Sequence, residues 1–179
     1  MATSTTRLIT FAEFERLPDP QFGRHELRHG EPVIVAPPKL KHSVVQRRLR
    51  RLLEAAAGET GIVDSEFGFK PLPDGEFRIA DVVFISQVRW RRIDLDGYFE
   101  GAPELVAEIL SPSNTKTEIL DKKKLCLENG AQEFWVVDID HRKVDVSTPD
   151  GRTVTYKAGQ QIPLFFVLGA HLNVDAILG

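Results

Sequence analysis

What the chain has little of sets the first limits on its function. One cysteine, Cys126, among 179 residues excludes an internal disulfide and is compatible with a reducing cytosol. No apolar run is long enough to span a membrane and the start lacks the apolar core of a signal peptide, so we expect a cytoplasmic protein without a membrane partner. The formal net charge of −3 argues against coating of nucleic acid through bulk charge, although an enzyme with a local basic patch is compatible with it.

The remaining composition is ordinary for a soluble globular protein, with 42% hydrophobic and 27% charged residues. A chain of 179 residues predicts a single domain over 1–179 that buries a real core. We expect residues 1–6, which are rich in Thr and Ser, to be disordered.

One apolar segment carries a carboxylate in its middle. The run from Leu105 to Leu110 lies between Pro103 and a Ser111-Pro112 turn, which is typical of a fully covered strand, and Glu108 interrupts it. A buried glutamate is costly unless a metal, a lysine or a hydrogen-bond donor pairs with it. The chemical surroundings of Glu108 are therefore the central question about this chain.

A second apolar segment, Phe77 to Ser86, also carries a single interior acid, Asp81. If the two strands lie side by side, Asp81 and Glu108 converge, and two adjacent carboxylates do not both ionise easily without a counter-charge. A divalent cation such as Mg²⁺ supplies that charge and favours oxygen ligands. A lysine from 122–124, within a helix predicted over 115–128, would complete a hydrolytic site.

The rest of the pattern predicts an α/β fold, a mixed sheet with helices on its faces. Capping, periodicity and turn signals predict further helices over 11–17, 41–57 and 174–178, and strands over 24–28, 31–36, 61–70, 134–138, 143–148 and 153–157. Residues 87–101 are expected to be irregular. The apolar stripe of the 41–57 helix is predicted to consist of Val44, Val45, Leu49, Leu52, Leu53 and Ala56.

An acid on each of two strands with a lysine nearby resembles the PD-(D/E)XK nucleases, which have a restriction-endonuclease-like fold. Within that superfamily the chain resembles the Uma-two family of bacterial endonucleases over nearly its whole length. The matching segments are HELRHGE (25–31), the APP turn (36–38) followed by His42, IADVVFIS (79–86), GAPELVAEILSPS (101–113), DKKKLCLENGAQEFWVVD (121–138) and VLGAHLNVDAIL (167–178).

The resemblance implies a role for four residues. Asp81 and Glu108 match the metal-binding acids and would hold Mg²⁺ or Mn²⁺, with the carbonyl of Ile109 as a further possible ligand. The motif lysine is moved to the following helix, where Lys122 is the best match and Lys124 the next. Glu26 matches the upstream glutamate of the family, as a ligand of a second metal or a group that positions the first.

The chain departs from the family at two positions. Ala80 stands where a proline is usual, and Cys126 stands where the lysine helix usually has tyrosine. The second departure concerns local packing, and neither changes the chemistry.

Structural roles are open for each of these residues. The two strand acids could be satisfied by backbone amides or arginine, the lysines could form a solvated helix face, and Glu26 could pair with Arg28. Cys126 suits a small core position better than a nucleophile. Surface positions are expected for His25, His29 and His42, although His42 could contact a substrate phosphate. Phosphate or subunit contacts are open for two clusters, Arg47/Arg48/Arg50/Arg51 and the segment around Trp90.

The leading hypothesis is a metal-dependent endonuclease that acts on DNA as a homodimer. The alternatives are an inactive nucleic-acid-binding protein that keeps the nuclease fold, and a hydrolase of a small phosphoester. Added salt separates the last from the others, because DNA binding weakens steeply with salt. For the dimer interface, the Trp90 segment and the hairpin near Asp150 are the candidates.

Overall fold

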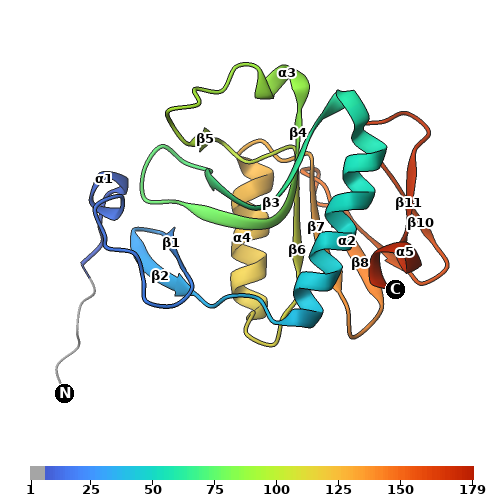
Figure 1. Ribbon diagram of the computed structural model, residues 1–179, viewed down its shortest axis with the longest axis horizontal. Helices are drawn as coiled ribbons and strands as arrows, with labels where there is room; N and C mark the ends of the chain where they lie inside the picture. The colour runs from blue at the N-terminus through green and yellow to red at the C-terminus, as the bar shows by residue number, and fades with distance from the viewer. Residues whose placement is uncertain (1–6) are drawn as a thin grey trace.

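A seven-stranded mixed sheet lies at the centre of the structure, with the long helices α2 and α4 on its two faces (Figure 1). This computed structural model describes residues 7–179. The disorder predicted for residues 1–6 therefore concerns residues outside the described part. Within 7–179, no helix is both long and apolar enough to cross a bilayer.

The elements follow one another as short strands and helices, many of them as the sequence predicts. The helices are α1 Phe11–Phe14, α2 Leu40–Ala57, α3 Gln87–Trp90, α4 Lys116–Glu128 and α5 Val174–Leu178, with a 3₁₀ turn over Gly58–Thr60. The strands are β1 Arg24–Arg28, β2 Glu31–Val35, β3 Gly61–Lys70, β4 Arg78–Ser86, β5 Phe99–Glu100, β6 Leu105–Ile109, β7 Glu133–Asp138, β8 Lys143–Ser147, β9 Thr153–Lys157, β10 Gln161–Pro163 and β11 His171–Asn173.

The large sheet has the strand order β5-β3-β4-β6-β7-β8-β9. The β3–β5 and β6–β7 pairs are parallel and the other pairs antiparallel, so α4 is the crossover between β6 and β7. The strands that carry the two acids, β4 and β6, are neighbours, as their sequences suggest. Two further antiparallel pairs, β1–β2 and β10–β11, lie outside this sheet.

Alternation along the strands separates two hydrophobic cores. Val82 and Phe84 of β4 pack on the α2 side with Leu49, whereas Val83 and Ile85 pack in the second core with Cys126 of α4. A strand that is covered on both faces reads as an apolar run, which is why β4 and β6 are recognisable in the sequence.

The alternation inverts at one point, between Glu66 of β3 and Asp81 of β4. The β3–β4 pairing runs through Ser65↔Val82 and resumes at Phe67↔Ala80, so the opposed Glu66 and Asp81 fall in a gap. Glu66 has φ 55°, a left-handed conformation that costs energy for a residue with a Cβ. Ala80 and Val82 are two residues apart and would face the same side of a regular strand. Beyond the gap, however, Ala80 packs in the core on the α4 side, whereas Val82 packs on the α2 side.

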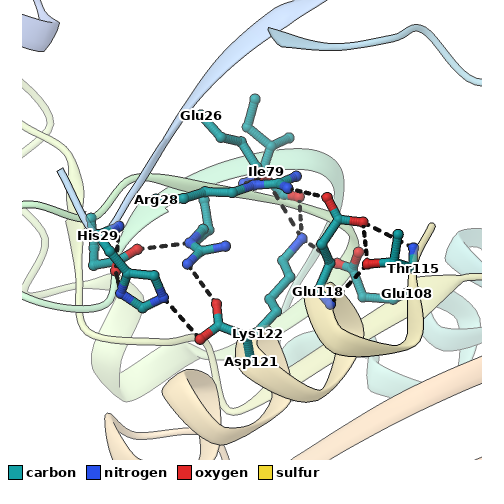
Figure 2. A network of polar contacts seen from close by, with 11 residues as sticks. Glu26, Arg28, His29, Ile79, Glu108, Thr115, Glu118, Asp121 and Lys122 are labelled. Atoms are coloured by element: carbon teal, nitrogen blue, oxygen red, sulfur yellow. Dashed lines mark hydrogen bonds and ion pairs between the residues drawn. The ribbon is translucent and has the colours of Figure 1, made fainter. Parts of the chain in front are cut away.

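The β1–β2 hairpin docks against the start of β4. Leu27 is fully buried and its N–H and C=O exchange hydrogen bonds of 2.9 Å with Phe77. A buried arginine, Arg78, donates to Glu76 Oε2 at 2.8 Å and to Asp121 Oδ2 at 2.9 Å. His29, in the hairpin turn, bridges the same two carboxylates at 2.7 and 2.9 Å (Figure 2). The hairpin is thereby tied to both β4 and α4.

Three local predictions differ from the structure. The first helix ends at Phe14 instead of residue 17. The segment 87–101 contains the short helix α3 and strand β5 instead of being irregular throughout. Helix α2 turns His42 and Gln46 inward together with Val45, whereas Val44, which was assigned to the apolar stripe, is 37% exposed.

Candidate active site

Strands β4 and β6 bring Asp81 and Glu108 face to face. The register Val82↔Ala107, extended by one residue, places Asp81 opposite Glu108. The backbone N–H of Ile109 donates to Asp81 Oδ2 at 2.7 Å, which ties the aspartate to the neighbouring strand. The side chains are 18% and 9% exposed, so both carboxylates sit largely out of water but remain reachable from it.

Helix α4 supplies the lysine of the site. The helix starts with a capping box in which Thr115 and Glu118 satisfy each other's backbone N–H groups, and this fixes the start of the helix. One turn later Lys122 points at the acids: its Nζ lies 2.7 Å from Glu108 Oε1 and donates to the carbonyl of Ile79 at 2.7 Å (Figure 2). Lys124, by contrast, is 75% exposed, so Lys122 is the lysine that reaches the cluster.

Strand β1 adds Glu26, which is 3% exposed. Its Oε1 accepts from Ile79 N–H at 2.8 Å and lies 3.7 Å from Lys122 Nζ, while Oε2 accepts from Arg28 Nε at 2.8 Å. Arg28 also donates to Glu118 Oε1 at 2.6 Å, which connects the hairpin to the first turn of α4 (Figure 2). The structure therefore brings Glu26, Asp81, Glu108 and Lys122 together in one cluster, and Glu26 pairs with Arg28 as well.

The charges in this cluster depend on one another. Burial raises the pKa of Glu108; Lys122 opposes this and Asp81 adds to it, so that the pKa of Glu108 rises to about 7. Burial alone lowers the pKa of Lys122, but Glu108 and Glu26 outweigh burial and hold this pKa above its ordinary value. Burial likewise raises the pKa of Glu26, yet the charges of Lys122 and Arg28 bring this pKa below its ordinary value. Lys122 is thus a fixed cation beside Glu108.

Helix α2 contributes a histidine that the sequence reasoning assigned to the surface. His42 is 7% exposed, and its Nε2 lies 3.0 Å from Asp81 Oδ2, so its surface assignment is wrong. Burial lowers the pKa of His42, but the hydrogen bond and charge of Asp81 outweigh burial and raise this pKa. The other two histidines are more accessible: His25 is half-buried and His29 is 63% exposed.

Two further polar residues next to Asp81 were not found from the sequence. Gln46 Nε2 donates to the backbone carbonyl of Asp81 at 3.0 Å and also to Glu66 Oε1. The spacing of His42, Gln46, Leu49 and Leu53 along one face of α2 was the available signal. The apolar stripe by itself does not include these two polar residues on the inward face.

The cluster lies at the wall of a cavity of about 390 Å³. The cavity lies between the β1–β2 hairpin, the start of α2 and the Ser111–Asn114 turn. Its lining includes the four predicted site residues, His42 and Glu66, and four further cations, Arg24, Arg28, Lys39 and Arg78. Acids and cations thus line the same cavity.

The residues present fit a hard divalent cation. Asp81 Oδ2 is engaged by Ile109 N–H and His42, whereas Asp81 Oδ1 makes no hydrogen bond within residues 7–179. Glu108 Oε1 forms the 2.7 Å ion pair with Lys122 but, like Oε2, makes no hydrogen bond in the same range. In the same range, no three His, Cys, Asp or Glu side chains are grouped to hold a metal. Mg²⁺ commonly uses one or two carboxylates and completes its shell with water and phosphate oxygens.

The other candidate residues lie outside the cluster or have structural partners. Cys126 is fully buried, and burial raises the pKa of its thiol to about 12, which suits a core residue. Arg48 donates to the carbonyl of Ile177, and Arg89 to the carbonyls of Glu100 and Ala102. The α3 segment with Trp90 lies at the end of the molecule opposite the first turns of α2 and α4 (Figure 1).

Comparisons with known proteins agree with this architecture. A crystal structure of a "putative nuclease belonging to DUF820" from Anabaena variabilis superposes with a TM-score of 0.82 at 22% identity, over 95% of this chain and 97% of the other. Among curated proteins none matches the chain. The structural likeness confirms the restriction-endonuclease-like mixed sheet flanked by helices.

The fold is that of the restriction-endonuclease-like class. The chain belongs to the Uma2 family, whose model, described as "Putative restriction endonuclease", matches residues 11–175. Membership of this family, which the sequence motifs indicated, is thereby confirmed. The catalytic and metal-binding roles of the individual residues stay predictions.

Proposed function

We propose that this protein is a metal-dependent endonuclease that hydrolyses phosphodiester bonds in DNA. The observation that carries the proposal is the cluster itself: two adjacent strand carboxylates and a buried lysine cation share one cavity, and each carboxylate has an oxygen without a hydrogen bond in the described residues. This combination suits hydrolysis of a phosphate ester, because an anionic substrate and a divalent cation each find opposite charge in the same place.

Each residue has a distinct role in the proposed reaction. Asp81 Oδ1 and Glu108 Oε2 would hold Mg²⁺ or Mn²⁺. When bound, this ion would polarise the phosphate and lower the pKa of the attacking water. Lys122 would keep Glu108 in place and offset negative charge that develops on the phosphate. Attack by water forms one P–O bond and the water gives up a proton, while the P–O bond to the 3′ oxygen breaks and that oxygen takes up a proton. The products carry a 5′-phosphate and a 3′-hydroxyl.

Glu26 acts on Lys122 in this proposal. Both of its oxygens are already engaged, Oε1 by Ile79 N–H and Oε2 by Arg28, and Oε1 lies 3.7 Å from Lys122 Nζ. This arrangement supports a positioning role in preference to that of a second metal ligand. Removal of Glu26 should therefore affect the reaction through the position of Lys122.

DNA is the proposed substrate because cations line the cavity together with its acids. Arg24 and Lys39 are exposed at its lining, and Arg28 lies deeper. With a net charge of −3, binding should depend on such local contacts and weaken steeply with salt. A homodimer would bring two such sites to one duplex, with β9, the outermost strand beside β8, as a candidate interface. Light scattering that gives a monomer at micromolar concentration would contradict the dimer.

A small phosphoester is the second candidate substrate. The cavity volume of about 390 Å³ falls within the range of about 300–1,000 Å³ typical of small-ligand pockets. Hydrolysis of bis(p-nitrophenyl) phosphate that resists added salt, without cleavage of DNA, would favour this alternative. Salt-sensitive DNA binding without any cleavage would favour an inactive binding protein.

Cleavage of supercoiled plasmid tests the proposal directly. The wild type should nick or linearise the plasmid with Mg²⁺ or Mn²⁺ and stay inactive in EDTA, and Asp81→Ala and Glu108→Ala should abolish cleavage. Glu128→Ala, which removes an exposed acid of α4, is the matched control and should cleave normally. Absence of cleavage with every metal and substrate, together with no calorimetric signal for divalent-ion binding, would refute the metal-nuclease proposal.

A further inference from the structure

Helix α2 contacts Asp81 at two separate atoms. His42 Nε2 lies 3.0 Å from the side-chain oxygen Oδ2, and Gln46 Nε2 donates to the main-chain carbonyl of the same residue at 3.0 Å. His42 and Gln46 are four residues apart and therefore lie on one face of the helix. Both are buried, with 7% and 5% of their surface exposed.

The packing of α2 makes this contact rigid. Farther along the same face, Leu49 and Leu53 are fully buried in the core that α2 shares with β4 and β6. A helix anchored in this way cannot slide or rotate without losing that burial. His42 and Gln46 consequently approach Asp81 from a fixed support.

Asp81 needs such a support because the sheet holds it on the β6 side but not on the β3 side. Asp81 stands in the gap of the β3–β4 pairing, opposite Glu66 with its φ of 55°. Gln46 fills the gap, since it donates both to the carbonyl of Asp81 and to Glu66 Oε1. The β3–β4 pairing is thus interrupted at the residue that the proposed function requires to be exactly placed.

The hydrogen bonds also decide which oxygen of Asp81 is available. Ile109 N–H and His42 both engage Oδ2, so Oδ1 is left without a hydrogen bond in the described residues. Because a carboxylate oxygen is an acceptor, Nε2 of His42 is the donor in this contact. The second ring nitrogen, Nδ1, is buried and has no partner within residues 7–179, which costs stability.

We propose that His42 and Gln46 are positioning residues that orient Asp81 so that Oδ1 faces the bound divalent cation. The inference rests on the proposed function, because it concerns the same metal site. Neither residue touches the metal or the substrate in this scheme. Outer hydrogen-bond partners of metal ligands typically contribute about 10–100-fold to metal affinity or activity.

Calorimetric titration of the metal-free protein with Mn²⁺ tests this role without relying on turnover. His42→Leu should raise the dissociation constant for Mn²⁺ about 10–100-fold. His42→Gln, which keeps a donor at the position of Nε2, should recover most of the affinity. Gln46→Met, which keeps the volume but removes the donor, should also weaken binding. The matched control is His141→Leu, because His141 makes a similar 2.9 Å contact with Asp138 but is 77% exposed and outside the cavity.

Melting curves of the metal-free variants separate positioning from folding. Titrations are made at a temperature where every variant is folded, so that a purely structural histidine would lower the melting temperature and leave the dissociation constant unchanged. Wild-type affinity in folded His42→Leu, or failure of His42→Gln to recover any affinity, overturns the inference. If the wild type binds no Mn²⁺, the proposed metal site itself falls and this inference falls with it, an outcome distinct from the other two.

Discussion

Replacement of Lys122 by methionine removes the cation from a buried group of carboxylates. The Nζ atom lies 2.7 Å from Glu108 Oε1 and 3.7 Å from Glu26 Oε1, and the side chain is 8% exposed. Removal of one partner from a buried ion pair costs about 3–5 kcal/mol, because the remaining charge stays buried without compensation. For a chain of this length, each kcal/mol lowers the melting temperature by about 2–4 °C.

The stability that Lys122→Met loses should depend on pH, because Glu108 can take up a proton. The pKa of Glu108 is about 7 in the wild type, and loss of Lys122 raises it further. A carboxyl group with a raised pKa in the folded state favours folding at lower pH, since the folded protein keeps a proton that the unfolded chain has lost. In the wild type, protonation of Glu108 adds stability below pH 7. In the variant, where the pKa of Glu108 is higher, the same gain begins at a higher pH. The stability difference between them therefore shrinks from pH 9 to pH 7, by up to about 1.4 kcal/mol per unit.

Urea unfolding followed by circular dichroism in EDTA, at pH 9 and pH 6, measures both effects. Lys124→Met is the matched control, because Lys124 is 75% exposed on the same helix, and its effect should stay within about 0.5 kcal/mol. The double variant Lys122→Met/Glu108→Gln should recover much of the loss, because no charge at position 108 is left buried. If Lys122→Met is as stable as the wild type at pH 9, or loses the same free energy at both pH values, the electrostatic reasoning is wrong.

Two further predictions concern the metal and the buried arginine. Calorimetry should show Mn²⁺ binding about tenfold weaker at pH 6 than at pH 8. The reason is that the metal competes with the proton on Glu108, whose pKa is about 7. Equal affinities at the two pH values would contradict this competition. Arg78→Met should lower the free energy of unfolding by about 3–5 kcal/mol in the same urea experiment, because it leaves the buried Glu76 without the Arg78 cation. Arg152→Met is the control: this arginine is 80% exposed, and its replacement should change the free energy of unfolding by less than about 0.5 kcal/mol.

Local sequence patterns were sufficient to identify the strands and the acids. Apolar runs interrupted by one carboxylate marked β4 and β6, and the prediction that Asp81 and Glu108 converge is confirmed by the register of these strands. The inward placement of one lysine on α4 is also confirmed, because helical geometry allows Lys122 and Lys124 to point in different directions. These features depend on residues close in sequence or on the simple rule that apolar strands pair within a core.

The sequence by itself therefore determined the α/β pattern, the family and the positions of the acids. Only the tertiary structure decided how Asp81 is oriented, because the gap opposite Glu66 breaks the two-residue period that strand predictions use. It likewise decided that His42 faces inward, because a buried polar residue needs a hydrogen-bond partner. The partner of His42 is Asp81, which lies 39 positions away in the sequence and belongs to another element. Hydrophobic periodicity records which residues avoid water, whereas hydrogen bonds between distant elements leave no such periodic trace.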